Sequence, residues 1–109
     1  MIRNHVPLQL YTCVVNSSLA KRLNAKDPEL RRFLQLATAA VSALPKEEDA
    51  RYVTNYLNGL LEGGKTWARA DEHFVTGIEG TLLEIADSNE SAREACEMVY
   101  RWLKRRGRI

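Results

Sequence analysis

Apolar residues recur at steps of three and four along most of this chain, which is the repeat of an α-helix that buries one face. There are too few strand candidates in the sequence to build a sheet. One stretch is ambiguous, because LQLYTCVV at 8–15 could form a helix or a short strand. We therefore predict an all-α fold, a single-domain bundle of about five helices.

Capping signals divide this pattern into segments. Asp27-Pro28-Glu29 combine a capping side chain, a proline for the first helical turn and an acid near the positive end of the helix. Pro45 ends that helix and begins the next, and Gly63 lies where a C-terminal cap glycine is expected. Thr66 can cap a fourth helix, and Ser91 with Glu94 resembles a capping box, a signal that places the fifth start only to within two or three residues. The helices predicted in this way cover about residues 8–24, 28–44, 45–62, 67–86 and 91–106.

The composition fits one small domain. The 109 residues are 45% hydrophobic and 28% charged, which is enough to bury a core without metals or disulfides. We therefore treat 1–109 as one helical domain with a short basic tail from about residue 104. Cys13 and Cys96 both lie among apolar neighbours, and we expect two buried, reduced thiols, with a single disulfide as the alternative. No apolar run is long enough to cross a bilayer, and we expect a cytoplasmic protein without membrane contact.

The segment GLLEGGKT at 59–66 matches the phosphate-binding loop pattern literally. Such a loop needs a buried strand that leads into it, and the preceding ARYVTNYLNGLL contains the polar Asn55 and Asn58. We interpret this stretch as an amphipathic helix that ends at the glycine pair, with Gly59 on its outer side. The sequence therefore predicts no nucleotide and no other cofactor.

The residues needed for metal binding or catalysis are sparse. His5 and His73 are the two histidines, and the two cysteines are distant in sequence, so a structural zinc site lacks ligands. Cys96 is predicted to face the core, and Cys13 has no basic neighbour to activate its thiol. We predict no metal site and no catalytic residues, and hence a protein that is not an enzyme.

One face of the fourth predicted helix carries two glycines without an evident packing reason. At about 100° per residue, positions 73, 77, 80 and 84 lie on the side opposite the core. Missing side chains there would let the backbone of a partner approach closely. The alternative is a solvent face that tolerates glycine. The candidate docking residues are Arg69, His73, Gly77, Gly80 and Glu84.

The net charge of +2 conceals a strong asymmetry along the chain. Residues 1–45 sum to +4, residues 46–100 to −7 and residues 101–109 to +5. Basic clusters can contact phosphates, although cations at the C-terminus of a helix also favour the helix itself. The candidates for nucleic-acid contact are Lys21, Arg22, Arg31, Arg32, Arg101, Lys104, Arg105, Arg106 and Arg108.

These observations favour a small, non-enzymatic interaction protein, an adaptor, regulator or inhibitor that binds a larger protein or complex. The alternative is a nucleic-acid-binding regulator, or a small subunit of a ribonucleoprotein complex that uses the basic C-terminal segment. The first predicted helix is apolar almost all round in its first half, so it could also mediate homo-oligomerisation.

Overall fold

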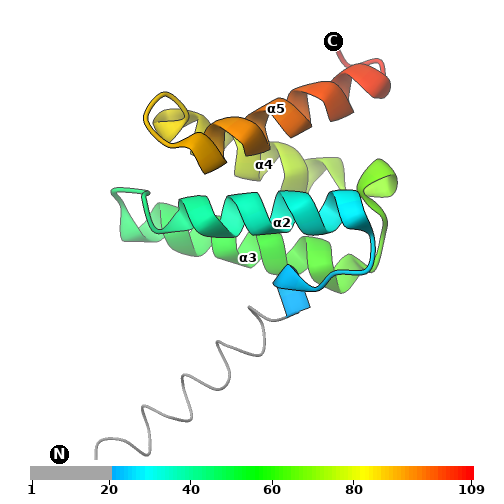
Figure 1. Ribbon diagram of the computed structural model, residues 1–109, viewed down its shortest axis with the longest axis horizontal. Helices are drawn as coiled ribbons and strands as arrows, with labels where there is room; N and C mark the ends of the chain where they lie inside the picture. Colours follow the sequence, from blue (N-terminus) through cyan, green and yellow to red (C-terminus); the bar gives the residue numbers. More distant parts are fainter. Residues whose placement is uncertain (1–20) are drawn as a thin grey trace, which may run out of the picture.

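The computed structural model describes residues 21–109, and these residues form an all-α bundle (Figure 1). The fold class predicted from the sequence is thereby confirmed. Several predictions concern residues 1–20, which lie outside the described residues: the choice between helix and strand for 8–15, the burial of Cys13 and oligomerisation through the first predicted helix. Of that helix, only 21–23 are described, and they are helical. The elements are α2 (Pro28–Val41), α3 (Glu47–Gly63), the 3₁₀ turn η2 (Trp67–Arg69), α4 (Glu72–Leu82), the 3₁₀ turn η3 (Leu83–Ile85) and α5 (Glu90–Arg105).

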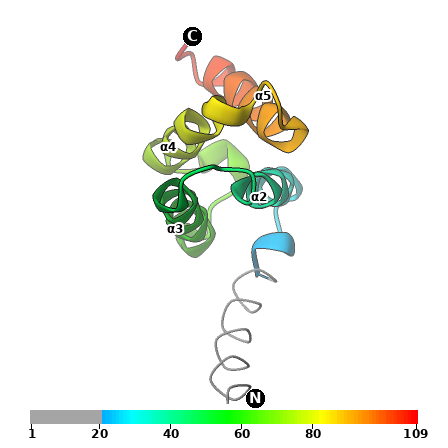
Figure 2. The ribbon, with the colours of Figure 1, turned by 90° about the vertical axis from the view of Figure 1, so that its left-hand side faces the viewer.

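Helices α2 to α5 of the described residues form two layers around one core. α2 and α3 make one layer and α4 and α5 the other, as the view along the helices shows (Figure 2). α3 packs against α4 and α2 packs against α5, so each helix contacts a neighbour in both layers. Within residues 21–109, no helix is long and apolar enough to cross a membrane.

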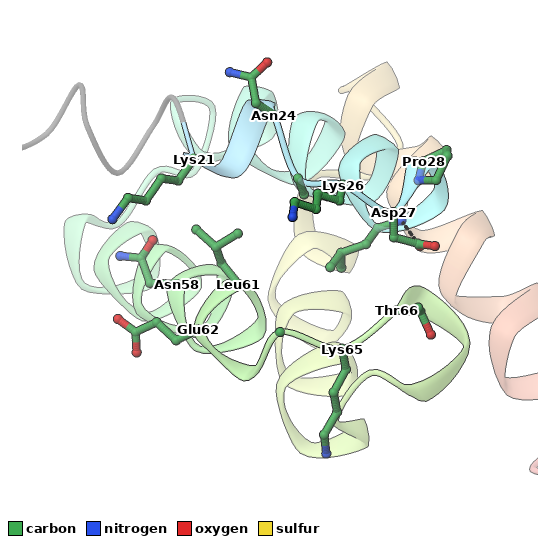
Figure 3. Close-up of a pocket in the computed structure, with 13 residues that line it drawn as sticks. Lys21, Asn24, Lys26, Asp27, Pro28, Asn58, Leu61, Glu62, Lys65 and Thr66 are labelled. Atoms are coloured by element: carbon green, nitrogen blue, oxygen red, sulfur yellow. Dashed lines mark hydrogen bonds between the residues drawn. The ribbon is translucent and has the colours of Figure 1, made fainter.

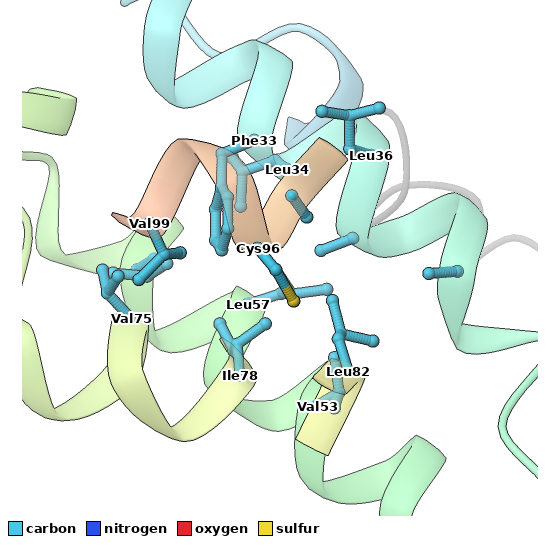
Figure 4. Packing of buried hydrophobic residues seen from close by; sticks show 14 of the residues in the cluster. Phe33, Leu34, Leu36, Val53, Leu57, Val75, Ile78, Leu82, Cys96 and Val99 are labelled. Carbon is cyan, nitrogen blue, oxygen red and sulfur yellow. The ribbon is translucent and has the colours of Figure 1, made fainter. Parts of the chain in front are cut away.

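The core is built from the apolar stripes that the sequence pattern predicts. Figure 4 shows Phe33, Leu57, Ile78 and Val99 from the four helices meeting in the interior, and each is fully buried. Burying one such side chain contributes about 1.5–3 kcal/mol, so this shared interior dominates the stability of the bundle.

An aromatic cluster closes the end of the core near the C-terminus of α5. The ring of Trp67 lies 4.6 Å from that of Phe33 and 5.6 Å from that of Trp102, measured between centroids. The indole N–H of Trp102 donates a hydrogen bond of 2.6 Å to the carbonyl oxygen of Trp67. The two tryptophans therefore fix η2 against α2 and α5.

The cap at Asp27 is confirmed and does more than the sequence suggests. Its Oδ2 atom accepts a hydrogen bond of 3.0 Å from the backbone N–H of Leu30, as expected for an N-cap. The same oxygen accepts a second bond of 3.1 Å from the backbone N–H of Trp67. One carboxylate thus joins the start of α2 to the start of η2.

Several predicted helix ends are wrong by a few residues. α2 ends at Val41 rather than 44, and the left-handed cap glycine of α3 is Gly64, with φ of 65°, rather than Gly63. Thr66 precedes only the three-residue η2 and makes no capping hydrogen bond through its side chain, and Asp71 caps α4 after Ala70 leaves the helical conformation. α5 begins at Glu90 under the cap Asn89, whose side chain accepts from Ala92, so the Ser91 capping box does not form.

Candidate functional site

A row of three rings lies where α3 packs against α4, and we call it the aromatic ladder. It consists of Tyr52, Tyr56 and His73. Tyr52 and Tyr56 are one turn apart on α3, and their rings are 4.2 Å apart between centroids. The hydroxyl of Tyr56 is 2.9 Å from Nε2 of His73 on α4, within hydrogen-bond distance. A hydrogen bond with Tyr56, followed by burial, raises the pKa of the Tyr52 hydroxyl. These contacts hold the exposed Tyr52 ring in a defined position.

Gly77 lies directly beneath these two tyrosines. A β-carbon placed on Gly77 would be 2.6 Å from Cε2 of Tyr56 and 2.7 Å from the hydroxyl oxygen of Tyr52. The prediction that no packing explains the α4 glycines is therefore wrong for Gly77, because the side chains of Tyr52 and Tyr56 occupy the space that a β-carbon there would need. Gly80 differs, since a β-carbon at that position would have no neighbour within 4 Å.

Beside the ladder is a shallow groove of about 540 Å³, which we call the α3–α4 groove. The first turns of α3 form one wall, and the middle and C-terminal part of α4 forms the other. Thr76 and Thr81 donate their hydroxyl protons to backbone carbonyls of α4, so those hydroxyls are already engaged. The lining residues are Glu48, Asp49, Tyr52, Thr76, Gly77, Gly80 and Thr81.

The structure separates the five predicted docking residues. Gly77 and Gly80 line the α3–α4 groove, and His73 adjoins it through Tyr56. Arg69 lies in η2 and Glu84 in η3; both are exposed, and neither lines the groove.

Sequence reasoning missed the α3 wall of this groove. Tyr52 fits the helical stripe of α3, a position that would ordinarily face the core, yet the residue is 39% exposed. Glu48 and Asp49 fit a first helical turn and needed no other interpretation. The signal that could have found the site is the spacing of Tyr52 and Tyr56, which places two large rings on one edge of the helix.

The basic residues near the start of the described chain do not form one exposed patch. Arg22 is buried, with 6% exposure, and burial lowers the pKa of its guanidinium. Arg31 donates a hydrogen bond of 2.9 Å to the carbonyl of Ala25. Arg32 forms an ion pair of 2.7 Å with Glu94 on α5. Of the four candidates in this region, only Lys21 is exposed without an ion pair to the described part of the chain.

Arg106 in the basic tail has an internal role. Its guanidinium stacks 3.8 Å from the centre of the Trp102 ring and donates to the carbonyls of Ala68 at 3.0 Å and Ala70 at 2.8 Å. It also lies 3.7 Å from the carboxylate of Glu72. Arg106 therefore fastens the end of α5 to η2.

The remaining cations of residues 101–109 divide into two groups. Arg105 pairs with Glu29 at 3.5 Å, which places the tail beside the start of α2, and Arg108 pairs with Glu72 at 3.0 Å. Arg101 and Lys104 have no ion pair within residues 21–109. The surface that brings Arg101 and Arg32 together also carries acidic side chains, namely Glu29, Glu94 and Glu97. Phosphate contacts there would compete with these carboxylates.

The phosphate-loop match spans the end of a helix, as predicted. Residues 59–63 belong to α3, and no strand occurs in the described part of the chain. Gly59 is not on the outer side of that helix, however, because a β-carbon there would be 2.7 Å from the Phe74 ring of α4. Gly59 therefore allows α3 and α4 to pack closely and does not form a phosphate-binding turn.

Cys96 is buried in the core, as predicted (Figure 4). Burial, followed by the nearby carboxylates of Glu79 and Glu97, raises the pKa of its thiol to about 11. Such a thiol is protonated at neutral pH and is a poor nucleophile. Among residues 21–109, no three histidine, cysteine or acidic side chains are placed to hold a metal ion.

Comparison with known protein families, with characterised proteins and with solved structures finds no match to this chain.

Proposed function

We propose that this chain is a non-enzymatic interaction protein that acts in the cytoplasm and binds a larger protein through the α3–α4 groove. The observation that carries the proposal is the Tyr52 ring, which is 39% exposed at the groove and positioned by Tyr56. Aromatic side chains dominate the binding energy of many protein interfaces. A ring that is already positioned loses little conformational entropy when a partner covers it.

Gly80 supports the same surface. Its backbone is exposed, and no atom lies within 4 Å of the place where a β-carbon would be. A glycine in a helix costs roughly 0.5–1 kcal/mol relative to alanine. Unlike Gly77, it is not required by packing within the described chain, so a close approach by a partner gives it a purpose.

The charge of the groove indicates the chemistry of the partner. Glu48 and Asp49 line it and form no ion pair with other described residues, and no lysine or arginine lines it. A partner segment that carries arginine or lysine would complement these carboxylates, and a guanidinium could also stack on Tyr52.

Capture from native lysate with the tagged full-length chain tests the proposal. Tryptophan at Gly80 fills the groove, whereas tryptophan at Gly63, another exposed and open helical position, adds the same bulk outside it. We expect a protein that is retained by the parent chain and by Gly63→Trp and lost with Gly80→Trp. Equal retention by both variants would remove the α3–α4 groove from the proposal.

A nuclease-treated half of the same lysate separates the nucleic-acid alternative. Retention that survives nuclease favours direct protein binding, and retention that disappears favours the exposed Arg101 and Lys104 on α5 as phosphate contacts. Salt alone does not separate the two, because an acidic groove that binds a basic segment also weakens as salt rises.

A further inference from the structure

A second and larger groove lies at the other end of α3, between its C-terminal turn and the segment that precedes α2 (Figure 3). It has a volume of about 990 Å³ and shares no lining residue with the α3–α4 groove. Leu61 supplies partly exposed apolar surface along it, and the largely buried Ala25 and Leu30 also line it. We call it the lysine groove, because Lys21, Lys26 and Lys65 lie along its rim.

The positive charge of the lysine groove is not neutralised within the described chain. All three lysines are exposed, and none forms an ion pair there. The carboxylate of Asp27, which also lines the groove, accepts two backbone N–H groups through Oδ2. Glu62 is the other acid in the lining, and in Figure 3 it points away from Leu61.

The lysines differ in direction. In Figure 3, Lys21 and Lys26 extend from the segment before α2 toward α3, where Leu61 lies, whereas Lys65 extends away from both. The Lys26 ammonium group therefore extends toward Leu61, and that of Lys21 extends toward Asn58.

The size and chemistry of the lining narrow the ligand. Small-molecule sites commonly measure about 300–1,000 Å³ and combine apolar walls with a few charged groups. None of the lining residues is aromatic, so a nucleobase has no ring on which to stack. An alkyl chain needs only apolar contact.

We propose that the lysine groove binds a small amphipathic molecule with one anionic head group, a carboxylate or a phosphate. The head group contacts Lys21 and Lys26, and the apolar body lies against Leu30 and Leu61. This site is independent of protein docking at the α3–α4 groove, and either can fail without the other.

Three ligands with the same decyl chain test the proposal on the full-length protein. Decanoate, decyl phosphate and decyltrimethylammonium are titrated below the concentrations at which they aggregate, while amide chemical shifts are followed by NMR. We expect both anions to shift the amides of Leu61 and Gly64, and the cation to leave them unchanged. The ratio of the two anion affinities shows whether the groove favours a carboxylate or a phosphate. Equal binding of the cation, or no shift with either anion, overturns the proposal.

Variants of equal charge provide the matched control. Lys21→Gln with Lys26→Gln should weaken binding of the better anion by about tenfold or more, because charge-assisted hydrogen bonds are about twice as strong as neutral ones. Lys46→Gln with Lys104→Gln removes the same charge from exposed positions outside the groove and should leave the affinity within about twofold. Lys65→Gln should lower the affinity less than the Lys21 and Lys26 variant does, because the Lys65 side chain points away from the groove. An equal loss in the two double variants would show that net charge alone attracts the ligand, and would overturn the site.

Discussion

The two glycines of α4 form a matched pair, of which only Gly80 should gain stability when it is replaced by alanine. Both lie within the same helix, yet Gly80 is open and Gly77 lies beneath Tyr52 and Tyr56. Alanine at either position gains about 0.5–1 kcal/mol of helix stability, because glycine has more backbone freedom to lose on folding. Gly80→Ala should gain all of it, since its β-carbon meets no atom within 4 Å.

At Gly77 the same gain is opposed by overpacking. The new methyl group would lie 2.6 Å from a ring carbon of Tyr56, so the ring or the helix must move. Tyr56 cannot turn away freely, because its hydroxyl is hydrogen-bonded to His73 and its ring packs edge-on against Phe74. Overpacking of this kind costs about 1–3 kcal/mol. Gly77→Ala should therefore be neutral to about 2.5 kcal/mol destabilising, and less stable than Gly80→Ala by about 1–3 kcal/mol.

Urea unfolding followed by circular dichroism measures both free energies. The contact with Tyr56 can be isolated with a double-mutant cycle, in which Tyr56→Ala should make Gly77→Ala less destabilising and should leave the effect of Gly80→Ala unchanged. The contact with the Tyr52 hydroxyl remains in that background, and Tyr52→Phe removes it. If Gly77→Ala and Gly80→Ala stabilise the parent protein equally, the tyrosine side chains of α3 do not pack closely against α4 at Gly77. The position of Tyr52 at the α3–α4 groove would then lose its structural basis.

Three further outcomes are expected. Arg106→Ala should lower the free energy of unfolding in urea by about 2 kcal/mol, because its charged group donates to the carbonyls of Ala68 and Ala70 and stacks on the Trp102 indole. Arg105→Ala removes only an exposed ion pair and should cost about 0.5 kcal/mol or less. Equal costs for the two variants would contradict the internal role of Arg106. In a Cys13→Ser background, iodoacetamide should alkylate Cys96 far more slowly in the folded protein than in urea, as mass spectrometry can follow. Rapid alkylation of the folded protein at neutral pH would contradict the burial of Cys96. Because burial raises the pKa of that thiol to about 11, the unfolded chain loses the thiol proton first as pH rises. The free energy of unfolding should therefore fall as pH rises through the ordinary thiol range toward 11. Asp27→Ala leaves two backbone N–H groups without their acceptor and should cost about 2 kcal/mol in the free energy of unfolding. Asp27→Asn keeps an acceptor oxygen and should cost less, and equal costs would show that the two hydrogen bonds to Oδ2 contribute nothing.

The fold class could be predicted because helical periodicity and capping residues act locally. Asp27 and Pro28 start α2 through contacts within one turn, and the buried side chains of the core follow the predicted stripes. Helix ends were less predictable where tertiary contacts compete with local signals. Trp67 is the clearest example, because η2 ends after three residues while the indole packs between Phe33 and Trp102.

The candidate site was predictable only in part, for a related reason. The sequence shows that Gly77 and Gly80 share a side of α4, but not that α3 covers one of them and leaves the other open. Arg106 illustrates the same limit: a basic residue at a helix end predicts a solvent-exposed charge, and only the position of η2 turns it into a structural contact. The function of such residues depends on which elements become neighbours.

The acidic first turn of α3 has an explanation that requires no partner, because carboxylates stabilise the positive N-terminal end of a helix. Glu48 and Asp49 alone therefore do not argue for docking. Tyr52 and Gly80 have no such explanation, since a large ring remains 39% exposed beside a helical position that lacks a side chain without being crowded. The docking proposal thus depends on shape before charge. Gly80→Trp, which fills the groove and leaves every charge in place, is for that reason a more decisive variant than neutralising the carboxylates.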